Sequence, residues 1–400
     1  MGQTQSTNDF ITSVDASSNV PSEFYLSCRN GDIEKVEQML TQLNTAIINR
    51  LEPNGSTSLH AASFYGHKRI VQILLQNGAK SWIINKYKMT PYDEAANDEI
   101  RSLFRRPLRT DSSRFADDDT NNGCLQFISE KKTSENSTNN IPNGWISGYK
   151  NIGKYFQSKN IKLIVRAQII KYYLASLQRS NDCARELRRI LKHNVPSDHD
   201  DYKTACFLFD EYCSRNQIEY LIRLYTLETD FYRALHSNAE IFAVEIYSQL
   251  QNLKGRFFQG KSYRGLSMAT EDIDEYKWGI HNQETLIEIK TLTSTSVDPK
   301  VAYEFARGQK ANNTNSHRVI CEFHFDRQCS TAIDLRHHAD KNLLCLSAYA
   351  DEAEVLVLPG TLFKVHDVHQ EKETSRYTIV LKNIHVPLDI ILEAFKEVQA

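Results

Sequence analysis

The N-terminal quarter of the chain repeats itself with a period of about 33 residues. Thr57 and Ala62 are followed one period later by Thr90 and Ala95. Between them, segment 66–75 carries its apolar side chains at i, i+1, i+4 and i+5, which is one face of a helix. A unit of this length cannot bury its apolar face alone, so neighbouring units must stack. The period therefore predicts an all-α array of repeats at this end of the chain.

The motif within the period identifies the repeat. Gly55-Ser-Thr-Ser-Leu-His-Ala-Ala62 resembles the ankyrin signature T-P-L-H-x-A, with Ser58 in the proline position. Segment 31–40 copies the second helix of the unit, so the resemblance covers about residues 21–106 as two full repeats and a truncated third. It implies either a module that binds a protein partner or a cap on the next domain. His60 is expected to stabilise a turn rather than to bind a ligand.

Composition excludes several classes of protein. A length of 400 residues favours two or three domains. With 48 basic and 50 acidic residues the chain lacks the basic surface that nucleic-acid binding needs. Its apolar runs are too short to cross a bilayer. The eight cysteines show no CxxC spacing, which favours free thiols in a reducing compartment over disulfides or a zinc site. We therefore expect a cytoplasmic protein.

The first residues and the segment after the repeats are polar. We expect a disordered leader over residues 1–20 that lacks the apolar run of a signal peptide. Its start, Met1-Gly-Gln-Thr-Gln-Ser6, fits the pattern for myristoylation of Gly2, which would give weak membrane association. Residues 107–143 are rich in Ser, Asn and Asp and are predicted to be a solvated linker.

The remaining residues, 144–395, change from one periodicity to another. From Trp145 to about Gln251 the spacing is helical, with an apolar stripe at Ile161, Ile164, Val165, Ile169, Ile170 and Leu174. From Gly260 onward there are short apolar runs divided by polar turns, which predict strands at 318–325, 354–358, 361–365 and 377–381. Helices followed by strands predict an α+β domain.

Three polar motifs lie in the strand-rich part. They are Tyr263-Arg264-Gly265, the tripeptide Ser294-Thr-Ser296, and Glu352-Ala-Glu354 in front of an apolar run. Each motif alone is short, but their order and spacing resemble the arginine-specific mono-ADP-ribosyltransferases. Segment 225–235 also resembles that family's lead-in to its helical subdomain. The resemblance covers about residues 150–390 and implies a helical subdomain followed by two packed sheets around an NAD cleft.

The resemblance implies a role for each motif residue. Arg264 would hold the pyrophosphate of NAD bidentately, as a guanidinium does better than an ammonium, and Gly265 would allow close backbone approach. Ser294 would hold the nicotinamide ribose and the catalytic glutamate. Glu354 would stabilise the positive charge that develops on the ribose. If the segment is extended, Glu352 points the same way as Glu354 and can take a proton from the acceptor.

Two aromatic residues complete the predicted site. Phe305 could stack on the nicotinamide ring, or it could belong to the core beside Ala302 and Ala306. Tyr349 is suited to lie against an incoming guanidinium. The chemistry requires NAD as co-substrate and no metal, and the pair His337-His338 is interpreted as a surface turn.

The implied activity is transfer of ADP-ribose from NAD to arginine side chains of proteins, with release of nicotinamide. Two alternatives remain open: an NAD glycohydrolase, with water as acceptor, and an inactive domain in an ankyrin-based adaptor. The expected partners are a protein substrate with an accessible arginine and a protein bound by the repeats. A second Glu-x-Glu, Glu371 to Glu373, lies between the last two predicted strands and is rejected as the catalytic pair.

Overall fold

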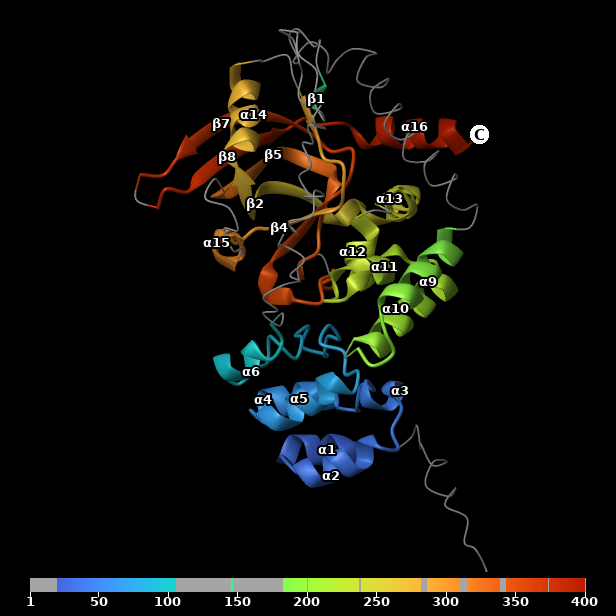
Figure 1. The fold of residues 1–400 in the computed structure, drawn as a ribbon. Coiled ribbons are helices and arrows are strands. Elements are labelled where there is room, and N and C mark those ends of the chain that lie inside the picture. Colours follow the sequence, from blue (N-terminus) through green and yellow to red (C-terminus); the bar gives the residue numbers. More distant parts are fainter. Residues whose placement is uncertain are drawn as a thin grey trace, which may run out of the picture. The chain divides into compact units, whose positions relative to one another are not determined.

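A computed structural model describes residues 20–105, 145–146, 183–199, 201–236, 239–281, 286–308, 316–338, 343–372 and 374–399. The chain divides into two compact units, Met1–Phe104 and Arg105–Ala400 (Figure 1). The predicted leader except Val20, the whole of the predicted linker and the apolar stripe at 161–174 lie outside the described residues. Within those residues, no helix combines the length and the apolar character needed to cross a bilayer.

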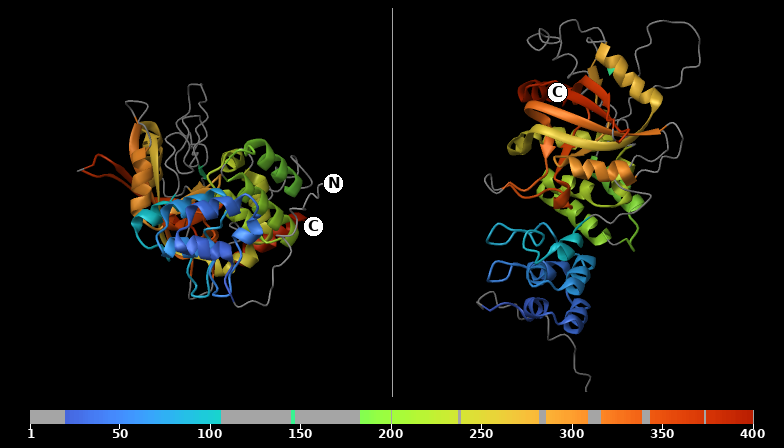
Figure 2. Two further views of the ribbon diagram at one scale, coloured as in Figure 1. Left: turned by 90° about the horizontal axis from the view of Figure 1, so that it is seen from below. Right: turned by 90° about the vertical axis from the view of Figure 1, so that its left-hand side faces the viewer.

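The first unit is a stack of short helices. They are α1 (Glu23–Asn30), α2 (Ile33–Leu40), α3 (Thr45–Ile48), α4 (Ser58–Phe64), α5 (Lys68–Gln76) and α6 (Asp98–Ser102). Apolar residues predicted to share one helix face, including Ile70, Val71 and Leu74, are buried in its core. Loops drawn in blue and cyan project from one side of the helices (Figure 2).

His60 stabilises a turn, as the sequence predicted. Thr57 caps α4, its side chain accepting from the His60 backbone N–H, while His60 Nδ1 accepts from the Thr57 backbone N–H. The second ring nitrogen, Nε2, lies 3.0 Å from the Met89 carbonyl oxygen and so ties one repeat to the next. Burial lowers the pKa of His60 to about 4, so the ring is neutral at pH 7.

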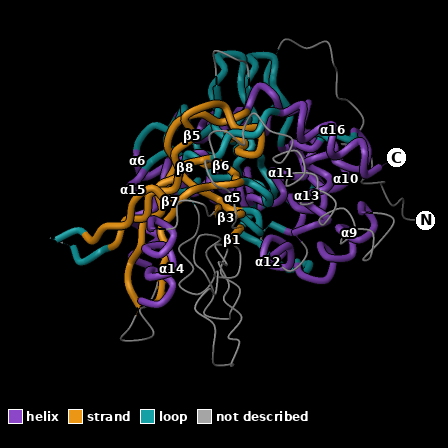
Figure 3. Tube along the Cα trace, turned by 90° about the horizontal axis from the view of Figure 1, so that it is seen from above, coloured by secondary structure: helices purple, strands orange, loops and turns teal. Residues whose placement is uncertain are grey.

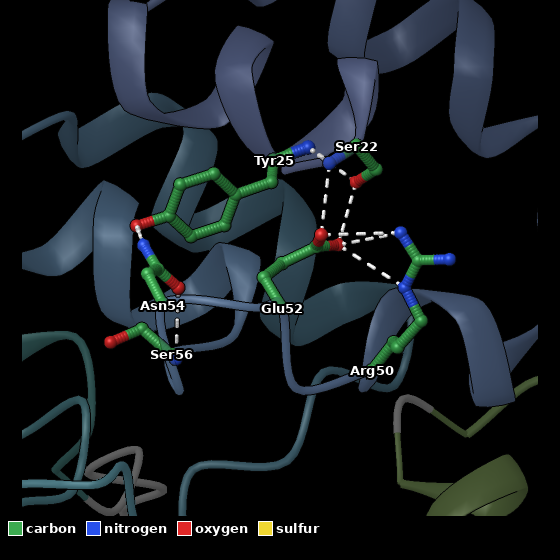
Figure 4. A network of polar contacts seen from close by, with 6 residues as sticks. All are labelled: Ser22, Tyr25, Arg50, Glu52, Asn54 and Ser56. Carbon is green, nitrogen blue, oxygen red and sulfur yellow. Dashed lines mark hydrogen bonds and ion pairs between the residues drawn. The ribbon is translucent and has the colours of Figure 1, made fainter. Parts of the chain in front are cut away.

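A polar network joins α1 to the loop before α4 (Figure 4). The buried Glu52 carboxylate accepts from the Ser22 backbone N–H at 2.9 Å and from the Ser22 hydroxyl at 2.6 Å. Arg50 Nη2 donates to the same carboxylate at 3.0 Å. Beside it, Asn54 Nδ2 lies 2.6 Å from the Tyr25 hydroxyl. A buried carboxylate with several donors can remain charged at a modest cost.

In the described part of the second unit, the helices α9 to α13 precede every strand except β1, which confirms the α+β class. The helices described before the sheet are α9 (Cys183–Asn194), α10 (Tyr202–Arg215), α11 (Ile218–Thr226), α12 (Asp230–His236), α13 (Ala239–Ser248) and the 3₁₀ helix η1 (Leu250–Arg256). Those described after it begins are α14 (Thr270–His281), α15 (Pro299–Gly308), η2 (Ala350–Glu352) and α16 (Leu388–Gln399).

The strands of this unit form one hydrogen-bonded sheet in the order β1-β3-β7-β8-β5-β2-β4-β6. They are β1 (Trp145–Ile146), β2 (Phe257–Ala269), β3 (Leu286–Glu288), β4 (Thr293–Ser296), β5 (Ser316–Asp334), β6 (Glu354–Val357), β7 (Leu362–Gln370) and β8 (Tyr377–Asn383). The two halves expected to pack as separate sheets are joined by β5. This 19-residue strand pairs with β8 and β2 and, at its end, with β6.

Helices α14 and α15 pack on opposite faces of β2, and Figure 3 shows both helices beside the strands drawn in orange. On one face, Leu266 and Met268 pack in the main core with Ile273 and Tyr276 of α14. On the other face, Tyr263 packs with Ala302 and Ala306 of α15 and with Ile320 of β5. This alternation is what a strand buried on both sides requires.

Candidate active site

The three polar motifs, remote in sequence, lie on strands that are neighbours in the sheet. Arg264 is on β2, Ser294 is on β4, and Glu354 begins β6, so β4 separates the other two. The ladder between β2 and β4 is the single pair Tyr263–Ser296. Beyond it, Arg264 Nη1 donates to the Ser294 carbonyl oxygen at 2.8 Å. The guanidinium therefore continues the connection between the strands where the backbone pairing ends.

Ser294 and Glu354 share one face of the sheet, whereas the Arg264 side chain leaves from the other. Ser296 is opposite Glu354 in the β4–β6 ladder, and Ser294 is two residues away on the same face. Thr295 Oγ1, on the opposite face, lies 2.9 Å from Ser262 Oγ of β2. By alternation Arg264 shares the face of Ser262. The structure thus brings the serine and the glutamate together, with the arginine reaching the backbone behind the serine.

The segment that carries the two glutamates is not extended. Glu352 ends the 3₁₀ helix η2, Ala353 is left-handed with φ 44°, and Glu354 starts β6. The expectation that strand alternation aligns the two carboxylates is therefore wrong, because a left-handed residue breaks the alternation. The turn is fixed to β4 instead: Ser296 Oγ donates to the Glu352 carbonyl at 2.6 Å. Both glutamates are buried, with 4% and 1% of their surface exposed.

The hydroxyl groups of Ser347 and Ser294 differ in their hydrogen bonding. Ser347 Oγ lies 2.9 Å from Glu354 Oε2 and provides a donor to the buried carboxylate. Ser294 is 1% exposed, and among the described residues its hydroxyl has no hydrogen-bond partner. Buried hydroxyls are normally satisfied, so an orphaned one beside a carboxylate is suited to bind a polar ligand atom.

The loop before the glutamates is held by α11, a role that the sequence reasoning did not identify. Arg223 Nη2 donates to the Cys345 carbonyl oxygen, and Thr226 Oγ1 accepts from the Ala348 backbone N–H at 2.8 Å. Burial lowers the pKa of Arg223 to about 10. The available signal was an arginine inside the apolar stretch of 221–224, since a buried guanidinium needs specific acceptors.

Gly265, Phe305 and Tyr349 are the remaining residues of the predicted site. A Cβ at Gly265 would stand 1.9 Å from the Ala302 carbonyl oxygen, so the neighbour that requires glycine here is the backbone of α15. Phe305 is on α15 and is partly buried. Tyr349 is partly buried and precedes η2. The stacking roles of both rings stay predictions.

The rejected motifs have structural partners. Glu371 pairs with Arg376 at 2.6 Å across the turn between β7 and β8. Asp334 accepts from Arg336 Nη2 at 2.7 Å and lies 3.0 Å from His338 Nε2. Both acids are therefore engaged in local ion pairs, and among the described residues no cluster of metal-ligating side chains occurs.

Comparison with known proteins identifies the first unit. Residues 24–104 match the family model for ankyrin repeats in three copies, which confirms the repeats. Among curated proteins, the chain is 36% identical over 76 residues to the NAD-capped RNA hydrolase NUDT12 of Homo sapiens and to that of Pongo abelii. The match covers 19% of this chain, which spans only 16% of the length of those relatives.

Solved structures of ADP-ribosyltransferases and effectors resemble part of the chain. The Vis toxin, an ADP-ribosyltransferase of Vibrio splendidus, is 17% identical with a TM-score of 0.28, covering 50% of this chain and 91% of its own. The type III effector XopAI of Xanthomonas axonopodis pv. citri is 14% identical with a TM-score of 0.33, covering 60% and 95%. Exoenzyme S of Pseudomonas aeruginosa is 16% identical with a TM-score of 0.30, covering 49% and 88%.

Proposed function

We propose that the second unit transfers ADP-ribose from NAD to arginine side chains of proteins and releases nicotinamide. The observation that carries the proposal is the shared face of Ser294 and Glu354 on adjacent strands, with the Ser294 hydroxyl buried and lacking a partner among the described residues. A buried serine and a buried carboxylate on the same face of adjacent strands form a polar pair, and such pairs are typical of binding sites.

Glu354 acts on the bond that breaks. The electron pair of the bond between ribose C1′ and the nicotinamide nitrogen leaves with nicotinamide, which becomes neutral, while positive charge develops on the ribose. A fixed carboxylate in a site that excludes water stabilises this charge strongly. Ser294 supplies a hydroxyl for the ribose. Arg264 reaches the Ser294 carbonyl from the other face of the sheet, and its contact with the pyrophosphate stays a prediction.

Glu352 acts on the bond that forms. A nitrogen of the acceptor guanidinium attacks C1′ and loses one proton, so the product guanidinium keeps its charge. Glu352 orients the acceptor and takes that proton. Tyr349 is proposed to lie against the acceptor and Phe305 against the nicotinamide. No step in this scheme calls for a metal ion.

The first unit is proposed to bind a protein, either the substrate or a separate partner. Ankyrin arrays expose loops and a helix face that suit protein–protein contacts. The cytoplasmic location, with weak membrane association if Gly2 is myristoylated, belongs to the same proposal.

The test is incubation of the full chain with NAD and agmatine, with nicotinamide, free ADP-ribose and ADP-ribosyl-agmatine measured separately. We expect Glu354→Gln to lower nicotinamide release by about 10² to 10³-fold. Glu352→Gln should lose transfer to agmatine while retaining hydrolysis. Glu371→Gln, in the other Glu-x-Glu sequence, is the matched control and should behave as wild type.

The products of the wild type and of Glu354→Gln distinguish the candidate functions. Free ADP-ribose as the sole product of the wild type would replace the transferase with an NAD glycohydrolase. An unreactive wild type that still binds NAD would favour the adaptor. Full activity in Glu354→Gln would overturn the mechanism.

A further inference from the structure

The loop between β5 and η2 carries a serine whose hydroxyl joins two parts of the site. Ser347 is 3% exposed, and its Oγ lies 2.9 Å from Glu354 Oε2 and 3.2 Å from the Tyr349 backbone nitrogen. The Tyr349 N–H can only donate, so Ser347 Oγ accepts from it. The single hydroxyl proton of Ser347 is then directed at the glutamate.

The backbone on each side of Ser347 is anchored to α11. Arg223 holds the carbonyl of Cys345, and Thr226 accepts from the N–H of Ala348. The side chain of Cys345 adds a third contact, because its thiol donates to the Ser347 carbonyl at 3.4 Å. Burial raises the pKa of this thiol to about 11, so it keeps its proton at neutral pH. These contacts leave the Ser347 hydroxyl little freedom to turn away.

We propose that Ser347 is a positioning residue that orients Glu354 for the cleavage of NAD, with α11 as the support that fixes Ser347. The inference rests on the proposed function, because it concerns the same glutamate. A donor to one carboxylate oxygen restricts rotation of the group. The hydrogen bond at Oε2 thus fixes the direction from which the carboxylate acts on the ribose.

The role predicts a specific kinetic pattern. Ser347→Ala should lower kcat for nicotinamide release by about 10 to 100-fold, while KM for NAD stays unchanged, because the serine touches the glutamate and not the substrate. Ser347→Thr keeps the hydroxyl and should restore kcat.

The matched control is Ser330→Ala. Ser330 is also a buried serine, on β5, and among the described residues its hydroxyl has no hydrogen-bond partner. It should leave kcat unchanged. A loss of kcat in Ser347→Ala that Ser347→Thr does not rescue would overturn the inference, as would an unchanged kcat or a rise in KM for NAD.

A second measurement separates this inference from the proposed function. Infrared difference spectra between wild type and Glu354→Gln isolate the carboxyl stretching bands of Glu354, whose frequency depends on the hydrogen bonds that the group accepts. The same difference on the Ser347→Ala background should show these bands shifted. If the wild type releases no nicotinamide but this shift is present, the proposed function fails and the Ser347 contact stands. If the shift is absent, the contact does not hold Glu354 and the inference fails.

Discussion

Acidification should weaken the ankyrin repeats through His60. The ring is buried in its neutral form, and burial lowers its pKa from 6.5 to about 4. In the unfolded chain the same ring takes up a proton near pH 6.5. Between these two values the unfolded state binds more protons than the folded state, so stability falls as the pH falls. The contribution is complete above pH 6.5 and is lost progressively toward pH 4.

The size of the effect follows from the two pKa values. One pKa unit corresponds to about 1.4 kcal/mol, so the full loss at pH 4 is about 3 kcal/mol. At pH 5 the unfolded ring is almost fully protonated and the folded ring is almost fully neutral, which gives a loss of about 2 kcal/mol. That is a large part of the stability of a small repeat array.

Hydrogen exchange can measure this loss locally. Peptides from α4 and α5 report the free energy of opening of the repeats, after correction for the pH dependence of intrinsic exchange. We expect that free energy to fall by about 2 kcal/mol between pH 7.5 and pH 5 in the wild type. His60→Gln removes the titrating ring and should flatten the dependence. Parallel curves for the two proteins would refute the reasoning.

Two further predictions concern the backbone of the second unit. Gly265→Ala places a Cβ 1.9 Å from the Ala302 carbonyl oxygen, so α15 must move. The free energy of unfolding should therefore fall by about 3 kcal/mol, measured by urea unfolding with Trp278 fluorescence as the signal. Gly255→Ala, which meets only an ordinary 3.5 Å contact, is the control and should stay within about 0.5 kcal/mol. Ala353→Val should lower the melting temperature, because a β-branched residue resists φ 44° at a cost of about 2 kcal/mol. Ala353→Gly should not lower it. Equal melting temperatures for the two variants would contradict the left-handed turn.

Local sequence patterns were enough to predict the repeat and four of the eight described strands. The period that relates Thr57 to Thr90 also relates Gly55 to Lys88, and both of the latter are left-handed, with φ of 79° and 62°. The strands predicted from apolar runs were confirmed as β5 to β8. Such features depend on residues close in sequence, because helix and strand periodicities and turn chemistry act within a few positions.

The way in which the candidate site is held depends on contacts between distant residues. The alternation expected for Glu352 and Glu354 is broken by Ala353, a left-handed residue that directly follows the contact between Ser296 of β4 and the Glu352 carbonyl. The support of the loop depends on Thr226 and Ala348, which are 122 positions apart. No local pattern encodes such a pair, because its two members meet only after the helices and the sheet have packed.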